Sequence, residues 1–460
     1  MVWEQRSFVI VMLTKVFDLV RSMCSKYWPD EIDQPEYYAP MEVTLLAEEQ
    51  LAEFTLRTFR LRRRFAVKGN AANENLVEKT MKLSFTDRAD DENRDGRIVY
   101  QFQYFQWPIH SVPSIDSLLH FRRRVRLTHQ NVLQSQPLER RPGPMVVHCS
   151  DGCGRTGAYL CIDANLELAD EDNMFDVFGY TRKMRQARKG MIDSPLQYKF
   201  VYECLKEAKD SGKTWFHVRE LPEMIKKKSI ITTQKVHNQV VKSNEYQREY
   251  EKIVKMTPMY SIGDCAGGHR VENRFKNRDF ATIPPDNYRP YLSTFQSNDS
   301  TDYVNAVFVD GYTRSKEYIV SEWPMTTTIC DTWSLIYDHD CNSVVILANP
   351  EDKSTYPPFW PTEKEKRRKY GPVFTVDCIS YNHYANIKSW ILRINKKVVS
   401  LTELMSGVKG VPKTTQVFQI TCWPDSHKVP TSTNALVEMM NMVERWRQRS
   451  AFGPVCVISA

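Results

Sequence analysis

The stretch that decides the fold is HCSDGCGRTG, which runs from His148 to Gly157. It follows Met145–Val147, a short apolar run typical of a buried strand, and leads into Thr156–Leu168, which is typical of a helix. Gly152 and Gly154 allow the intervening backbone to turn its N–H groups inward. A strand, a glycine-rich turn and a helix N-terminus form an arrangement that binds anions. The stretch therefore predicts an anion-binding loop in a mixed α/β protein.

The side chains of this loop suit nucleophilic attack on a tetrahedral dianion. Arg155 carries a planar guanidinium that can hold two phosphate oxygens. Inward N–H groups and the helix dipole add positive charge around the same point. These surroundings favour the thiolate of Cys149, which is the nucleophilic form of cysteine. Thr156 is expected to hydrogen-bond the sulfur when it becomes a leaving group.

Two other readings of the cysteine fit the sequence less well. Free cysteines are often simply buried, and this accounts for the remaining cysteines but not for Cys149 followed by a GxGR pattern. A zinc site is disfavoured because Cys149, Cys153 and Cys161 lack CxxC spacing and a suitably spaced histidine pair. We therefore expect no metal and no organic cofactor.

The odd number of cysteines, 11, without a CxxC pair is typical of a reduced, intracellular setting.

Composition indicates a globular chain of two to three domains. The 460 residues are 42% hydrophobic and 26% charged, which excludes a disordered or collagen-like protein. The net charge of +7 is modest, and the basic runs Arg60–Arg64 and Lys364–Lys369 are short and mixed, so we expect no nucleic-acid partner. No apolar run approaches the about 18 residues of a membrane helix. Membrane attachment would thus require a segment outside this chain.

The chain repeats a long pattern in the same order. The paired segments are Met1–Leu13 with Leu335–Leu347, Tyr27–Pro29 with Phe359–Pro361, Trp107–Pro113 with Trp423–Pro430, and Gly143–Ser150 with Gly453–Ala460. Such a period indicates a duplicated domain rather than a short solenoid repeat. We predict a first domain at residues 1–208, a linker at 209–231 and a second domain at 232–460. Because each copy lacks a part that the other has, we expect the chain to be a fragment of a longer protein.

The loop resembles the CxxxxxR[S/T] signature of protein-tyrosine phosphatases, and the tandem arrangement resembles the receptor-type branch of that family. The resemblance extends to TDYVNA at Thr301–Ala306, to DGY at Asp310–Tyr312 and to both Trp-Pro loops. It implies two tandem phosphatase-like domains of α/β (α+β) class, each a twisted mixed sheet flanked by helices. It also implies phosphotyrosine proteins as substrates and a phosphocysteine intermediate on Cys149. The implied catalytic residues are Cys149, Arg155, Thr156 and His148, the phosphate-binding residues are Ser150, Asp151, Gly152, Cys153, Gly154 and Arg155, and Gln197 positions water.

Three residues of the first copy depart from the family pattern. Ile109 stands where active members have the aspartate that protonates the leaving group, a contribution of about 10²–10⁴-fold. Asp151 puts a carboxylate where a dianion should bind, which repels the substrate and opposes the thiolate. Asp193 replaces a glutamine that orients water. The aspartate in the loop together with the lost acid resembles the islet-autoantigen branch of receptor phosphatases.

The second copy departs differently. Ser459 takes the place of the nucleophilic cysteine, and a serine hydroxyl is a poor nucleophile without a nearby base. Asp279 takes the place of the tyrosine that flanks the substrate ring. The Trp-Pro loop keeps its acid, Asp425. We therefore expect the second domain to be inactive.

Two hypotheses remain open at this point. The first is a weak receptor-type phosphatase that acts through Cys149. The second is an inactive scaffold that binds phosphotyrosine or other receptor phosphatase domains in signalling, and a lipid phosphate substrate is a weaker third reading. The resemblance implies a place on the cytoplasmic side of the plasma membrane, in a single-pass receptor whose transmembrane segment lies outside this chain.

Overall fold

The computed structural model describes residues 1–18, 21–63, 96–137, 141–236, 239–296, 300–397, 410–425, 427–449 and 453–460. The chain divides into two compact units, unit 1 at Met1–Thr257 and unit 2 at Pro258–Ala460. This division falls later than residue 231, where we predicted the linker to end. The boundaries 1–208, 209–231 and 232–460 thus stay predictions about where each copy begins and ends.

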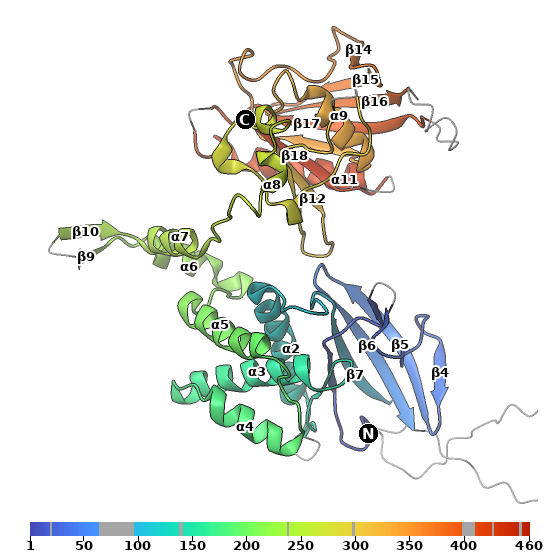
Figure 1. The fold of residues 1–460 in the computed structure, drawn as a ribbon, viewed down its shortest axis with the longest axis vertical. Coiled ribbons are helices and arrows are strands. Elements are labelled where there is room, and N and C mark those ends of the chain that lie inside the picture. Colours follow the sequence, from blue (N-terminus) through green and yellow to red (C-terminus); the bar gives the residue numbers. More distant parts are fainter. Residues whose placement is uncertain are drawn as a thin grey trace, which may run out of the picture. The chain divides into compact units, whose positions relative to one another are not determined.

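Unit 1 is built on a six-stranded mixed sheet (Figure 1). Its order is β4 (Pro35–Tyr38), β5 (Met41–Gln50), β6 (Phe54–Arg63), β7 (Arg97–Tyr104), β1 (Val9–Met12) and β8 (Val146–His148). The strands β4 to β7 are antiparallel, whereas β1 runs parallel to both β7 and β8. A separate hairpin joins β2 (Phe17–Asp18) to β3 (Arg21–Ser22). The strand that we predicted at Met145–Val147 is confirmed as β8. The apolar run at Phe8–Leu13 forms β1, and the alternating stretch at Arg97–Phe105 forms β7.

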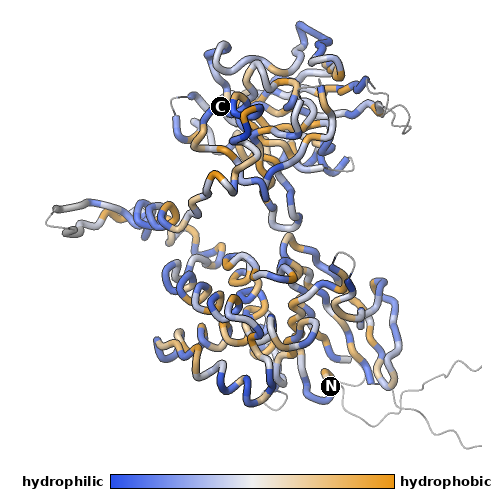
Figure 2. Tube along the Cα trace, in the orientation of Figure 1, coloured by the Kyte–Doolittle hydropathy of each residue, from blue (hydrophilic) through white to orange (hydrophobic). Residues whose placement is uncertain are grey.

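Helices of unit 1 pack on the sheet and extend beyond it. They are α2 (Ile115–Ser135), α3 (Gly154–Asp172), α4 (Val177–Ala187), α5 (Pro195–Ser211), η2 (Val218–Glu220), α6 (Leu221–Ser229) and α7 (Glu245–Met256), with a hairpin of β9 (Thr232–Val236) and β10 (Gln239–Ser243) between the last two. The helix α5 begins at a Ser194 side-chain cap followed by Pro195, which favours a helix start. The predicted linker therefore contains regular structure, including α6. Beyond the linker, α7 carries mainly hydrophilic residues (Figure 2).

Unit 2 contains an eight-stranded mixed sheet. Its order is β14 (Arg367–Tyr370), β15 (Phe374–His383), β16 (Ile387–Lys396), β17 (Lys413–Ile420), β13 (Ser343–Ile346), β18 (Val455–Ser459), β12 (Tyr318–Glu322) and β11 (Ala306–Val309). Its helical segments are α8 (Ala266–His269), η3 (Arg274–Lys276), η4 (Phe280–Thr282), η5 (Asp286–Tyr288), α9 (Ile329–Asp338) and α11 (Thr433–Arg447).

The two sheets share one topology, which confirms that the chain contains a duplicated domain. The first six strands of each sheet follow in the same spatial and sequence order. Even an irregularity is repeated, because the register shifts between Leu45 and Ala47 in β5 and between Cys378 and Ser380 in β15. The copies differ at their ends. Unit 2 adds β12 and β11 beside β18, whereas α3, α4 and α5 follow β8 in unit 1.

Each sheet of the two units carries hydrophobic clusters on both faces. In unit 1 the larger cluster joins alternate residues of β1, such as Val9 and Val11, to α2, α3 and α5. The opposite face places Ile10 and Met12 with Trp28 and Phe59. This alternation follows from the two-residue period of a strand.

In the described residues, no helix is both long enough and apolar enough to cross a membrane.

Candidate functional site

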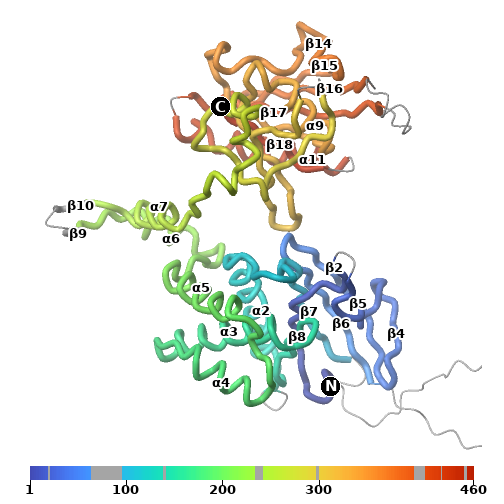
Figure 3. The backbone as a smooth tube through the Cα atoms, viewed as in Figure 1, coloured from blue at the N-terminus to red at the C-terminus, as the bar shows by residue number. Residues whose placement is uncertain are grey.

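The cysteine loop of unit 1 lies between β8 and α3, as the sequence predicts (Figure 3). Gly152 has a φ of +70°, a left-handed conformation that glycine adopts without strain. Gly154 packs against a carboxylate, since a Cβ at this position would lie 2.4 Å from Asp193 Oδ2. Both glycines thus serve the geometry of the loop, one through its backbone angle and one through close packing.

A cavity of about 230 Å³ opens in front of the loop. It brings together residues that are distant in sequence: Ile109 and His110 of the Trp-Pro loop, Cys149, Ser150, Asp151, Gly154 and Arg155 of the cysteine loop, and Asp193 and Gln197 near α5. His148, Gly152, Cys153 and Thr156 were also predicted as site residues, but they do not line this cavity. Their roles, like those of the lining residues, stay predictions.

The Asp151 side chain folds back into the loop. Its Oδ1 accepts a hydrogen bond from the Cys149 thiol, with an S–O distance of 3.2 Å, and another from the Cys153 N–H at 2.9 Å. Cys149 itself is only 4% exposed. The Asp151 carboxylate therefore accepts hydrogen bonds from a loop N–H and from the thiol, two donors that would otherwise be available to an anionic ligand.

Several donors keep this carboxylate ionised. Partial burial opposes ionisation, but the Cys153 N–H, the Cys149 thiol and the charge of Arg188 together hold the pKa of Asp151 below its usual value. Arg188 also donates a hydrogen bond of 2.8 Å to the backbone carbonyl of Asp151. Asp151 thus stays negatively charged at neutral pH, within the loop that is predicted to hold a dianion.

Arg155 donates hydrogen bonds to two backbone carbonyls and to a threonine hydroxyl. Its Nη1 donates to the carbonyl of Leu13 at 3.2 Å and to Thr14 Oγ1 at 3.4 Å, while Nη2 donates to the carbonyl of Pro108 at 3.2 Å. The side chain is 8% exposed, and burial lowers the pKa of Arg155, although nearby Cys149 and Asp18 partly oppose this. The guanidinium therefore links β1, the Trp-Pro loop and the cysteine loop.

His148 supports the loop from the strand side. Its Nδ1 contacts the Cys149 carbonyl at 3.1 Å, and its Nε2 contacts the Tyr27 hydroxyl at 2.7 Å. Gln101 donates a further hydrogen bond of 2.9 Å to Tyr27. Burial lowers the pKa of His148, so the imidazole is neutral at physiological pH. The ring thus contacts both the cysteine loop and Tyr27, and the predicted role of His148 stays a prediction. Thr156 Oγ1 is buried and makes no hydrogen bond among the described residues. Its contact with the sulfur as a leaving group stays a prediction.

The remaining lining residues come from loops and a small hairpin. Trp107 Nε1 donates to the Ser111 carbonyl at 3.2 Å and closes the Trp-Pro loop, which places Ile109 at the cavity. The Gln197 side chain accepts a hydrogen bond of 3.2 Å from the Asp193 N–H. Sequence reasoning missed Arg21, Ser22 and Met23, which also line the cavity. Their short hairpin has no motif or periodicity that would reveal it.

The corresponding positions of unit 2 have a different arrangement. Ser459 ends β18, and its carbonyl accepts a hydrogen bond from the Trp323 N–H. Asp279 caps η4 by accepting a hydrogen bond of 2.9 Å from the Ala281 N–H. Asp425 is exposed in the Trp-Pro loop. Across the part of the chain that the structure describes, no cluster of histidine, cysteine and acidic side chains is suited to hold a metal ion.

Comparisons with known proteins concern the chain as a whole. The family model described as "Protein-tyrosine phosphatase" matches residues 1–207 and 273–460. Receptor-type tyrosine-protein phosphatase U of Gallus gallus is 31% identical over 461 residues, covering 99% of this chain and 28% of that protein. Receptor-type tyrosine-protein phosphatase S of Gallus gallus and F of Danio rerio are each 31% identical over the same share of this chain, and 26% and 21% of their own lengths are covered. The chain thus spans less than a third of these relatives.

Proposed function

Because the chain belongs to the protein-tyrosine phosphatase family, we propose that unit 1 recognises phosphotyrosine proteins and hydrolyses the phosphate ester slowly. The Cys149 sulfur attacks phosphorus and the tyrosine oxygen leaves, after which water breaks the P–S bond and releases phosphate. Arg155 and the loop N–H groups hold the phosphoryl oxygens. With Ile109 at the acid position, the leaving oxygen takes its proton from water, which keeps the rate low.

The observation that carries this proposal is the cavity at which Cys149, Arg155 and Gln197 lie together. Within it, however, the Cys149 thiol and the Cys153 N–H donate hydrogen bonds to the Asp151 carboxylate. A phosphate group must displace that carboxylate, or bind beside it against charge repulsion, before it can use the same donors. The loop therefore retains the groups for phosphate binding and nucleophilic attack, but an internal anion competes for them.

Binding of vanadate to the full chain tests the site. Removing the competing carboxylate in Asp151→Ala should tighten vanadate binding by about tenfold, the effect of roughly 1.4 kcal/mol of repulsion. Arg155→Met should abolish binding because it removes the guanidinium. Asp30→Ala, which removes an exposed carboxylate of unit 1, is the matched control and should match wild type in calorimetry. Equal affinity in wild type and Arg155→Met would show that the loop is not the anion site.

A scaffold function is the second candidate, and the same contact of Asp151 with the nucleophile favours it. In that case unit 1 binds phosphotyrosine proteins or other receptor phosphatase domains without turnover. Unit 2, which has Ser459 in place of the thiol, is inactive under either proposal. We place both units on the cytoplasmic side of the plasma membrane, as parts of a single-pass receptor, by similarity to the receptor-type relatives.

A further inference from the structure

A buried polar network in unit 1 begins at Arg57 in β6. This side chain is 9% exposed, and its Nη1 donates hydrogen bonds to Gln101 Oε1 at 3.1 Å and to Gln103 Oε1 at 2.7 Å, both in β7. Its Nε donates to Glu48 Oε2 at 2.5 Å, and its guanidinium lies over the Trp28 ring, 4.6 Å from the ring centroid. Arg57 is therefore fixed against the sheet, and it binds both glutamines through their side-chain oxygens.

One branch of this network leads through Gln101 to His148. Because an arginine side chain can only donate, Gln101 accepts with its oxygen and directs its amide nitrogen to Tyr27. That nitrogen donates to the Tyr27 hydroxyl at 2.9 Å, and the hydroxyl lies 2.7 Å from His148 Nε2. Since the hydroxyl already accepts from Gln101, its own proton is directed to Nε2. The neutral ring then carries its hydrogen on Nδ1 and donates it to the Cys149 carbonyl at 3.1 Å.

A second branch leads to Arg155. Gln103, which also accepts from Arg57, donates through its Nε2 to the Thr14 carbonyl at 3.2 Å. The Thr14 hydroxyl accepts from Arg155 Nη1 at 3.4 Å. The two glutamines are 0% and 7% exposed, so solvent competes little for these contacts. Both branches thus end at residues that line the cavity of the cysteine loop, Cys149 and Arg155.

The two copies can be compared position by position. Arg6 and Asp340, which precede β1 and β13 by the same distance, both have left-handed φ angles, of 53° and 54°. The strand that follows this turn has the same register with its two parallel neighbours in both sheets. Arg57 corresponds to Trp390, because each is the fourth residue of its strand and pairs with the fifth residue of the next one.

Unit 2 has apolar side chains at four positions of the network. Arg57, Gln101, Tyr27 and His148 correspond to Trp390, Val417, Phe359 and Ile458. These four apolar residues are at most 4% exposed and belong to one hydrophobic cluster. The same sheet therefore forms without the polar groups. Because buried polar groups cost free energy unless each is paired, the network in unit 1 is better explained by the cysteine loop, which it reaches, than by the fold.

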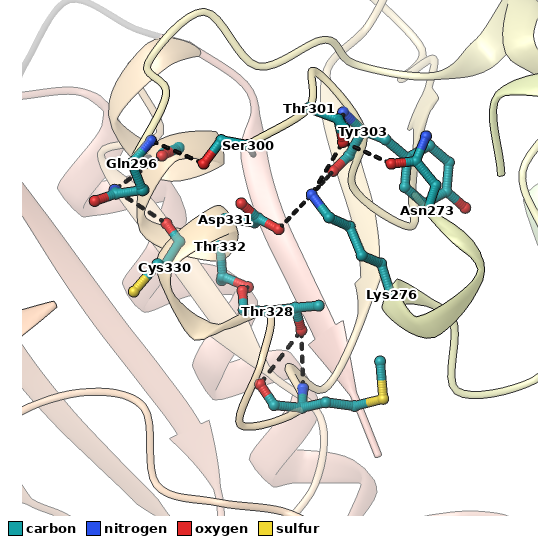
Figure 4. Close-up of polar contacts among 12 residues, drawn as sticks. Asn273, Lys276, Gln296, Ser300, Thr301, Tyr303, Thr328, Cys330, Asp331 and Thr332 are labelled. Carbon is teal, nitrogen blue, oxygen red and sulfur yellow. Dashed lines mark hydrogen bonds and ion pairs between the residues drawn. The ribbon is translucent and has the colours of Figure 1, made fainter. Parts of the chain in front are cut away.

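Unit 2 does have buried polar contacts at other positions. Figure 4 shows Lys276 between Asp331 of α9 and Thr301, with Nζ–O distances of 2.9 Å and 3.0 Å. The residues labelled there include none of the four apolar ones. The loss of polar groups in unit 2 is therefore specific to the positions that lead to the cysteine loop in unit 1.

We propose that Arg57 is a positioning residue for the cysteine loop, which acts by fixing the orientation of the Gln101 amide. Held in this way, the amide donates to Tyr27, and Tyr27 donates to His148. Without the arginine, the amide can turn and accept from Tyr27, which leaves the Tyr27 oxygen to accept from Nε2. The Cys149 carbonyl and Tyr27 would then compete for the hydrogen of one ring, and the loop would lose a fixed donor at its first residue. This inference rests on the function proposed for unit 1.

The position of the hydrogen on His148 can be measured in the full chain by NMR with nitrogen-labelled histidine, and the signal is assigned by its absence in His148→Gln. The wild type should show hydrogen on Nδ1 alone. Arg57→Gln, whose amide can accept as well as donate, should lose this single tautomer, whereas Arg57→Lys, which still only donates, should keep it. Adding Tyr27→Phe to Arg57→Gln removes the competing oxygen and should restore it. Arg63→Gln, at an exposed position of the same strand, is the matched control.

Vanadate binding relates the tautomer to the proposed site. Arg57→Gln should weaken it by about tenfold, as for the loss of one hydrogen bond to a charged group, and Arg57→Lys should bind like the wild type. Arg57→Met, which also frees the Gln101 amide, replaces Arg57→Gln if urea unfolding shows that the latter does not fold.

Equal spectra of Arg57→Gln and Arg57→Lys would overturn the proposal, and so would a tautomer that Tyr27→Phe does not restore. The spectra need no ligand. If the wild type itself fails to bind vanadate, the proposed phosphate site is wrong, while the spectra still decide the role of Arg57.

Discussion

Under the proposed function, two residues that line the cavity of unit 1, Ile109 and Asp151, should determine how fast this unit hydrolyses a phosphate ester. Ile109 cannot transfer a proton, and Asp151 holds the nucleophile through a hydrogen bond that only the protonated thiol can donate. The two residues affect different steps, because one concerns the leaving group and the other concerns the attacking sulfur. Their effects on turnover should therefore be separable.

Replacing Ile109 by aspartate should raise kcat by about 10²-fold for phosphate esters with poor leaving groups, the usual size of acid catalysis. Esters with good leaving groups need little protonation and should gain less. Asp151→Ala should act mainly on KM, and the double variant should exceed either single one. The measurement is steady-state kinetics on p-nitrophenyl phosphate and on a phosphotyrosine peptide. If the double variant stays as inactive as Cys149→Ser, the defect lies elsewhere, with Asp193 the next residue to test, and the scaffold proposal gains support.

At the scale of elements, the buried ion pair between Lys276 and Asp331 fixes the start of α9. The two side chains are 7% and 11% exposed, and burial raises the pKa of Asp331 although the lysine opposes this. Lys276→Met leaves a buried carboxylate without its partner and should lower the free energy of unfolding by about 3 kcal/mol. Adding Asp331→Leu should recover much of that loss. Urea unfolding followed by fluorescence measures both, and additive losses in the double variant would contradict the pairing.

The strand β12 contains a group that should make stability depend on pH. Burial raises the pKa of Glu322 to about 6, although hydrogen bonds from the Arg278 N–H oppose the shift. Because the folded state binds this proton more tightly than the unfolded state, Glu322 stabilises unit 2 at low pH. The contribution is lost as pH rises through about 6.

Glu322→Gln should remove that dependence. Its unfolding midpoint in urea, measured between pH 4.5 and 7, should change less with pH than the midpoint of the wild type. Glu351→Gln, at an exposed position of the same unit, serves as the control and should keep the wild-type slope. Parallel slopes in all three proteins would mean that Glu322 titrates alike in the folded and unfolded states.

For the whole molecule, catalysis should come from one unit only. Cys149→Ser in the full chain should eliminate all hydrolysis of phosphotyrosine peptides, because Ser459 lacks a thiol and no base activates it. A single-turnover assay with a radiolabelled peptide would detect even slow reaction. Hydrolysis that persists in Cys149→Ser and disappears on adding Ser459→Ala would instead assign activity to unit 2.

The sequence predicts the elements around the loop well, because their signals are local. Apolar runs identify β1 and β8, and the spacing of apolar residues identifies α2. The linker at 209–231 stays a prediction. Gly212 and Pro222 are typical of loops, yet a proline in the first turn also starts a helix, as in α6 within that range. Lys226–Lys228 then end that helix, where cations favour its dipole.

The parts of the candidate site that depend on side-chain conformation could not be predicted in this way. The sequence indicates that Asp151 repels a dianion, but the hydrogen bond to Cys149 depends on how its side chain turns within the loop. The contribution of Arg21–Met23 to the cavity depends on how tertiary packing places a hairpin whose two strands have two residues each. Such features arise from contacts between segments far apart in the chain, which single-sequence patterns do not record.

The shared left-handed turn at Arg6 and Asp340 also marks a point at which the two copies can be recombined. Arg6 and Asp340 have φ angles of 53° and 54°, and their carbonyls accept hydrogen bonds from the N–H groups of Gly143 and Gly453 respectively. We therefore expect that residues 258–340 of one copy can be joined to residues 7–211 of the other with the same turn at the junction. The resulting chimera would combine the strands β11 and β12 and the helix α9 with the cysteine loop and the helices α3 to α5. One recombinant gene would then encode both ends of the duplicated domain, without α6, α7 and the hairpin of β9 and β10.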